Sequence, residues 1–181
     1  MKKVVRRYWE ARELVLIGVF AAAAKLSSLL IALAGGGMNP VSLVLKNLVY
    51  TTLMIVLLKK VQKEWSLLLF TVIGMIVSVG LMGGSLTLLP AAITGALMAE
   101  LVMKLTGGAK TSWGPYLAVA IFDLASKGLS LGVSFLFMRE SPALMTMIVP
   151  IVICGYLGSL IGLWFGWKTV GELKHAGFVR S

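Results

Sequence analysis

The chain has very few residues of the kinds that build metal or catalytic centres. Its 181 residues include one cysteine, Cys154, and one histidine, His175. A single cysteine excludes an internal disulfide, and neither an HExxH motif nor paired-cysteine spacing is present to hold a metal ion. The P-loop pattern GxxxxGK[ST] is missing too, so we expect no nucleotide hydrolysis by the chain itself. These absences predict a protein that is not an enzyme and has no metal and no cofactor.

Charged residues are scarce as well, at 13% of the chain, whereas hydrophobic residues make up 59%. A soluble domain has about twice that charged fraction. The net charge is +10, but no nucleic-acid motif accompanies it and the cations border apolar runs. We therefore expect contact with membrane lipid and no nucleic-acid partner. The first apolar run, of about 21 residues, lacks a small-residue cleavage site, which favours a spanning helix over a cleaved signal peptide.

The apolar residues fall into six runs, each long enough to cross a bilayer core of about 30 Å. Turn residues and charges separate the runs, as at Gly35-Gly36-Gly37 and Lys59-Lys60. The pattern predicts an all-α integral membrane protein, in which residues 1–181 form a single domain, a compact bundle of six transmembrane helices. The predicted spans are about 14–34, 41–58, 66–82, 89–105, 116–138 and 143–167. Pro150 should kink the last span or delay its start.

Lysine and arginine are distributed unevenly between the two sides of these spans. Most precede the first span, follow the last, or lie in the second connection or around the junction of the fourth and fifth spans: Lys2, Lys3, Arg6, Arg7, Arg12, Lys59, Lys60, Lys63, Lys104, Lys110, Lys168, Lys174 and Arg180. The only lysine or arginine in the first, third and fifth connections is Arg139. Because short loops rich in lysine and arginine stay in the cytoplasm, the pattern predicts a multi-pass protein of the cell membrane with both termini cytoplasmic.

Ionisable residues inside the predicted spans are functional candidates, since a charge within a membrane is costly. They are Lys25, Lys46, Glu100, Asp123 and Lys127. Asp123 and Lys127 are four residues apart on one helix face, so we expect them either to form an ion pair or to present charge to a ligand. For Glu100, the favoured interpretation is a pair with Lys104, one helical turn away.

The two remaining lysines each have two interpretations. Lys46, near the outer end of its span, either snorkels to the outer surface or lies in an outward-facing pocket. Lys25, in the middle of the first span, either lies in the pocket or pairs with Glu100 or Asp123.

Polar residues gather in the outer half of the spans, which predicts an outward-facing pocket for a small molecule. The candidate substrate-binding residues are Lys25, Asn39, Lys46, Asn47, Asp123 and Lys127. Cations outnumber anions among them, which favours a ligand with an anionic group. We expect the glycine-rich loop of residues 35–39 to cover this pocket.

Small residues recur at helical spacing in the first, fourth and sixth spans. Such faces let helices approach closely in lipid, so packing within the bundle is one interpretation. The other is that the first span docks a partner membrane protein. The candidate docking residues are Gly18, Ala22, Ala24, Ser28 and Ala32.

Two segments resemble a known class of transporter subunit. They are Ala92–Gly107, with the sequence AITGALMAELVMKLTG, and Gly155–Arg180, with the sequence GYLGSLIGLWFGWKTVGELKHAGFVR. Together with the chain length, the six expected spans and the missing ATPase motif, they resemble the substrate-binding S component of energy-coupling factor (ECF) transporters. The more specific resemblance is to the branch named MptD or Trep_Strep.

The resemblance implies that the chain captures a small vitamin-like micronutrient from outside the cell. It also implies an ECF transmembrane coupling protein and two cytoplasmic ATPase subunits as partners, and toppling of the chain in the bilayer to release substrate inward. In such proteins an Ala-xxx-Ala pattern on the first helix often contacts the coupling protein, and Gly18–Ala22 and Ala24–Ser28–Ala32 match that pattern loosely.

Two alternatives remain open. One is a self-sufficient secondary transporter, although the two halves of the chain show no internal similarity of the kind that inverted repeats produce. The other is an accessory membrane subunit without a metabolite ligand.

Overall fold

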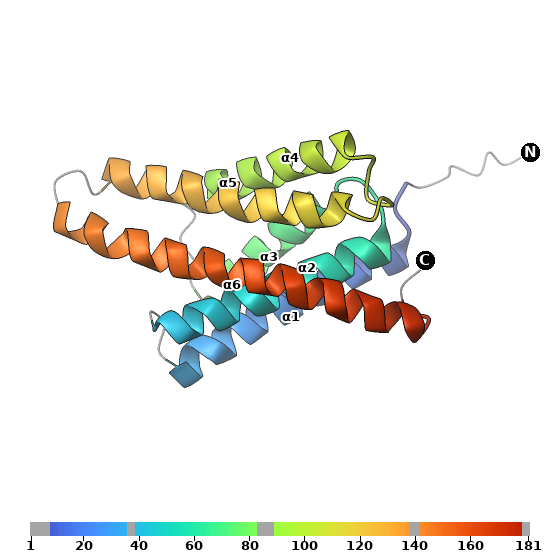
Figure 1. The fold of residues 1–181 in the computed structure, drawn as a ribbon, viewed down its shortest axis with the longest axis horizontal. Helices are drawn as coiled ribbons and strands as arrows, with labels where there is room; N and C mark the ends of the chain where they lie inside the picture. Colours follow the sequence, from blue (N-terminus) through green and yellow to red (C-terminus); the bar gives the residue numbers. More distant parts are fainter. Residues whose placement is uncertain (1–7, 36–38, 83–88, 138–141, 179–181) are drawn as a thin grey trace, which may run out of the picture.

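A computed structural model describes residues 8–35, 39–82, 89–137 and 142–178. These residues form six α-helices in the order predicted, which confirms the all-α fold (Figure 1). The helices are α1 (Ala11–Gly35), α2 (Pro40–Val61), α3 (Ser66–Met82), α4 (Leu89–Leu105), α5 (Gly114–Phe137) and α6 (Pro142–His175).

Local capping chemistry sets several helix ends. At the start of α2 the Asn39 side chain accepts a hydrogen bond from the Val41 backbone N–H at 3.0 Å, and Pro40 occupies the first turn, where its missing N–H is not needed. α6 starts at Pro142 and continues through Pro150 to His175. A delayed start at Pro150 was therefore wrong, and the helix runs well past the predicted end at residue 167.

The described helices have the lengths and surfaces of a multi-pass membrane protein. Four stretches are long and apolar enough to cross a membrane: Ala11–Gly35, Pro40–Val61, Gly114–Leu136 and Ile148–His175. α3 and α4 have 17 residues each, at the short limit for a spanning helix, so their crossing stays a prediction. Large apolar side chains point away from the bundle, and Val15, Leu33 and Leu136 are 63–74% exposed. A surface of this kind suits lipid.

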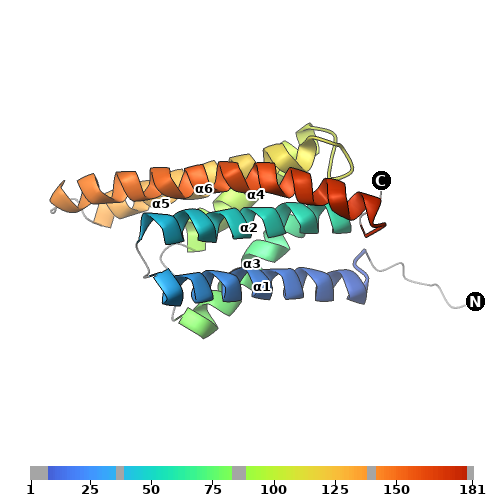
Figure 2. The same ribbon diagram turned by 60° about the horizontal axis from the view of Figure 1, so that its bottom comes forward.

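The helices form a closed ring. Going around it, the contacts run from α1 to α2, α6, α5, α4, α3 and back to α1. Figure 2 shows α2 between α1 and α6, and α2 also reaches across the ring to α3 and α5. α1 begins and α6 ends at the same end of the bundle (Figure 1). We call this the basic end, because Lys59, Lys60, Lys63, Lys104, Lys110 and Lys174 lie there.

Glycines let two pairs of helices approach at backbone distance. A Cβ built on Gly158 or Gly162 of α6 would lie 2.6–2.7 Å from a carbonyl oxygen of α2, at Val44 and Leu48 respectively. A Cβ on Gly95 of α4 would lie 3.1 Å from the Ser126 backbone nitrogen of α5. The small residues of α4 and α6 therefore pack within the bundle, as one interpretation of the sequence expected.

The half of the bundle next to the basic end is filled with apolar side chains. Ile17, Ile55, Leu58, Leu67 and Phe70, from α1, α2 and α3, have no exposed surface. Because they lie in the basic half of their helices, the centre of the ring is solid there.

Charged side chains also form hydrogen bonds and an ion pair with the connections at the basic end. The buried Lys59 ammonium donates to the backbone oxygens of Thr111 and Ser112 at 2.8 Å each, in the connection between α4 and α5. Lys63 forms an ion pair with Glu13 at 2.6 Å, which joins the α2–α3 connection to α1. Specific polar contacts therefore join the connections of the basic end to the helices.

Candidate ligand-binding site

A cavity of about 430 Å³ lies inside the ring, in the half opposite the basic end. All five helices from α1 to α5 contribute side chains to its wall. The lining residues are Lys25, Ser28, Lys46, Asn47, Tyr50, Thr71, Met75, Ala92, Phe122, Asp123, Ser126, Lys127 and Ser130. Five of the six predicted substrate-binding residues meet here, from three helices far apart in sequence.

Helical spacing explains why each helix contributes a small cluster. On α5, Asp123, Ser126, Lys127 and Ser130 follow the i, i+3, i+4, i+7 pattern of one helix face. On α2, Tyr50 lies one turn after Lys46 and Asn47, and so shares their side of the helix. Each cluster therefore comes from one side of its helix, and that side lines the cavity.

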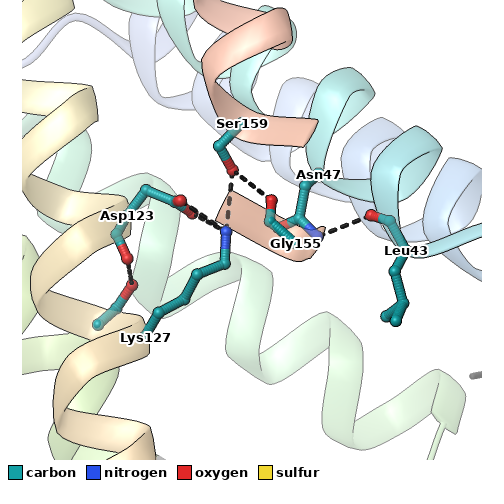
Figure 3. A network of polar contacts seen from close by, with 7 residues as sticks. Leu43, Asn47, Asp123, Lys127, Gly155 and Ser159 are labelled. Carbon is teal, nitrogen blue, oxygen red and sulfur yellow. Dashed lines mark hydrogen bonds and ion pairs between the residues drawn. The ribbon is translucent and has the colours of Figure 1, made fainter. Parts of the chain in front are cut away.

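Lys127 is the centre of a polar network between α5 and α6 (Figure 3). Its ammonium lies 2.6 Å and 2.5 Å from the two carboxylate oxygens of Asp123 and donates to Ser159 Oγ at 2.9 Å. Ser159 in turn donates to the Gly155 carbonyl at 3.3 Å. The predicted ion pair is thus present, and the Asp123 and Lys127 side chains are only 10% and 19% exposed.

Gly155 on α6 provides the space for this network. A Cβ at this position would lie 3.2 Å from Asn47 Nδ2 and 3.4 Å from Lys127 Cε. The Asn47 amide donates to the Leu43 carbonyl at 2.8 Å, one turn back along its own helix (Figure 3). Asn47 also lines the cavity.

Lys25 enters the cavity from α1, about ten residues before the end of that helix. Its ammonium lies 5.4 Å from the centre of the Tyr50 ring, a cation–π distance. Among the described residues it forms no ion pair with a carboxylate, so the expected pairs with Glu100 and Asp123 are absent. Of the two interpretations of Lys25, the structure supports the cavity.

The sequence favoured a pair between Glu100 and Lys104, but in the structure Glu100 binds the start of α3. Its carboxylate accepts hydrogen bonds from the backbone N–H groups of Trp65 at 3.0 Å, Leu67 at 2.8 Å and Leu68 at 3.3 Å. These are donors at the start of α3 that have no partner within the helix. The described residues contain no ion pair between Glu100 and Lys104.

The structure also places the loop and docking residues that the sequence predicted. Asn39 caps α2, and residues 36–38 of the loop expected to cover the pocket lie outside the described residues. Among the predicted docking residues, Ala24 is 1% exposed and Ser28 lines the cavity, so both face the interior of the bundle. Gly18, Ala22 and Ala32 are partly exposed, and docking through them stays a prediction.

The sequence interpretation missed several residues of the cavity wall. Tyr50, Thr71 and Phe122 are uncharged and lie within apolar runs of the sequence, so no charge singled them out. The available signal was helical spacing, because Tyr50 and Ser126 each lie about one turn from a charged candidate. The described residues contain no group of three or more acids, histidines or cysteines that could hold a metal ion. The residues that line the cavity carry ammonium, carboxylate, amide and hydroxyl groups together with apolar side chains.

Comparison with known proteins identifies the family. No curated protein and no solved structure matches the chain. The model of a family described as hypothetical bacterial integral membrane protein (Trep_Strep) matches residues 11–143, well over half of the chain. The match includes the segment Ala92–Gly107, which suggested this branch, and ends before Gly155–Arg180. The chain therefore belongs to the Trep_Strep family of multi-pass integral membrane proteins.

Proposed function

We propose that this protein is the membrane-embedded substrate-binding component of an ECF-type importer. It captures a small, vitamin-like anionic micronutrient from outside the cell. A transmembrane coupling protein and two cytoplasmic ATPase subunits then drive uptake, and the chain itself catalyses no reaction.

The observation that carries this proposal is the polar cavity inside the ring, in the half of the bundle opposite the basic end. Its wall contains Lys25, Lys46 and Asp123, whereas fully buried apolar side chains fill the centre of the ring toward the basic end. Charged groups inside membrane helices are expensive and mark ligand or ion sites by default. A cavity that ends on a packed core suits capture and release better than it suits a continuous channel.

The distribution of charge supports the direction of transport. With the basic end in the cytoplasm, as the positive-inside rule favours, the cavity lies in the outer half of the membrane. A ligand then enters from outside, and its release inward requires a large movement of the chain. The sequence has no P-loop, so the energy for that movement comes from other subunits.

The proposal is tested by gentle purification in nucleotide-free buffer followed by native mass spectrometry. We expect a bound small molecule on the wild-type protein and no ATPase activity. Ala92→Trp should abolish the bound species, because the indole would fill the cavity. Met98→Trp is the matched control on the same helix, since Met98 is 47% exposed on the outer surface and a larger side chain there meets lipid.

Uptake assays separate the alternatives. Accumulation of the bound metabolite in a host cell should require co-expression of a coupling protein and its ATPases. Uptake by the chain alone would contradict the proposal and favour a secondary transporter. If Ala92→Trp retained as much ligand as the wild type, the ligand would have to bind outside this cavity.

A further inference from the structure

The charges that line the cavity do not balance. Its described wall carries three lysines, Lys25, Lys46 and Lys127, and one acid, Asp123. Both carboxylate oxygens of Asp123 are taken by the Lys127 ammonium. The one acid on the described wall is thus already paired within α5, and Lys25 has no carboxylate partner among the described residues.

We infer that Lys25 is the counter-ion for a carboxylate ligand with an apolar body. This inference rests on the proposed function and names the class of molecule that the cavity takes. It also separates the roles of two lysines on the same wall, since Lys127 holds the bundle together and Lys25 binds the ligand.

The surroundings of Lys25 are built to hold a charge without an acid of the protein beside it. Its Cε lies 3.3 Å from where a Cβ of Gly74 on α3 would be, so the side chain lies against this neighbouring helix in a space that the glycine leaves open. The ammonium faces the Tyr50 ring at 5.4 Å. A cation–π contact offsets only part of the loss of hydration, whereas a ligand carboxylate would complete the pair.

The rest of the wall sets the nature of the ligand body. Tyr50, Phe122, Met75 and Ala92 present rings, a thioether and a methyl group to the cavity. Such a surface gains from burying apolar area, and the aromatic faces favour a flat group. The ligand that fits both features has one acidic group and a compact apolar or aromatic body.

The two lysines should respond to substitution with opposite signs. Without ligand, Lys25→Met raises the melting temperature, because it removes a partly buried cation that has no acid partner among the described residues. Lys127→Met lowers the melting temperature, because it leaves the Asp123 carboxylate uncompensated. Lys104→Met, at an exposed lysine of the basic end, is the control and should change little.

Binding is tested with matched probes that differ only in charge. Phenylacetate, naphthoate and indole acetate are each compared with their neutral primary amides by the shift in melting temperature of the full chain. We expect at least one carboxylate to stabilise the wild type and its amide to do so much less. Lys25→Met should lose this shift, with at least a tenfold rise in Kd, whereas Lys25→Arg and Lys104→Met should keep it.

Several outcomes would overturn the inference. These are equal stabilisation by acid and amide, no stabilisation by any acid of the panel, a shift that survives Lys25→Met, or a melting temperature of ligand-free Lys25→Met below that of the wild type. The importer proposal fails differently, through the absence of a co-purified molecule. A neutral co-purified molecule would leave the importer role intact and exclude the carboxylate.

Discussion

At the scale of single residues, the Asp123–Lys127 pair has the geometry of a structural contact. The lysine makes three short contacts, to two carboxylate oxygens and to Ser159 on the neighbouring helix. Removing one partner of a buried ion pair leaves a charge in a medium of low polarity, which costs about 3–5 kcal/mol, whereas removing both costs much less. The contribution of this pair to stability therefore depends on the two residues together.

We predict that Lys127→Met lowers the melting temperature of the purified protein by about 10 °C, given about 2–4 °C per kcal/mol for a chain of this size. Adding Asp123→Asn to that variant should restore most of the loss, because the uncompensated carboxylate is then gone. Differential scanning fluorimetry on the single and double variants measures both effects. If the double variant melts as low as Lys127→Met, stability at this site depends on packing and not on the ion pair.

Sequence spacing predicted local contacts of this kind and failed for distant ones. Asp123 and Lys127 are neighbours on one helix face, so their pairing followed from the helix alone. Glu100 had an equally good neighbour in Lys104, yet its carboxylate binds the start of α3, more than 30 residues earlier in the chain. That choice depends on the packing of α4 against α3, about which a single sequence says nothing.

At the scale of helices, the contact between α2 and α6 depends on glycine. Gly158 and Gly162 face the α2 backbone at Val44 and Leu48 so closely that a Cβ on either would collide with a carbonyl oxygen. A backbone cannot move aside as a flexible side chain can. Any larger residue at these two positions must therefore push α6 away from α2.

We predict that Gly158→Ala and Gly162→Ala each destabilise the protein by about 1–3 kcal/mol, the usual effect of overpacking. Gly171→Ala is the matched control on the same helix, because a Cβ there meets nothing within 4 Å. Its stability should be unchanged or higher by up to about 1 kcal/mol, since alanine favours a helix. Chemical or thermal unfolding in detergent measures all three, and equal stability of Gly158→Ala and Gly171→Ala would contradict the close contact.

Helix positions were largely predictable, and the main error has a physical cause. The bounds predicted at 66–82 and 89–105 coincide with α3 and α4, because glycines and charges mark both ends. The end of α6 was misplaced because hydropathy shows where the run of apolar residues ends, whereas the backbone can stay helical beyond that point. The helix continues past Trp167 with a polar surface, and the chain turns at Gly177, whose φ of +71° suits a helix end.

At the scale of the whole molecule, the two ends of the ring differ in structure and in charge. The basic half has an apolar centre and connections held by contacts such as those of Lys59, and the other half contains the polar cavity. The sequence predicted this division into a polar and an apolar half from the depth of polar residues. The order of the helices around the ring could not be predicted, since contacts such as that between Thr52 and Gly162 join residues 110 positions apart.

The last prediction concerns the orientation of this ring in the membrane. In a Cys154→Ser background, we expect Asn39→Cys to react with a membrane-impermeant maleimide in intact cells. Glu10→Cys, Lys110→Cys and Ala176→Cys, all exposed at the basic end, should react only after permeabilisation, because short basic segments stay in the cytoplasm. Labelling of positions 10 and 176 from opposite sides would require an odd number of crossings, and labelling of all three from outside would turn the cavity toward the cytoplasm. Either pattern is incompatible with capture of a nutrient from the exterior.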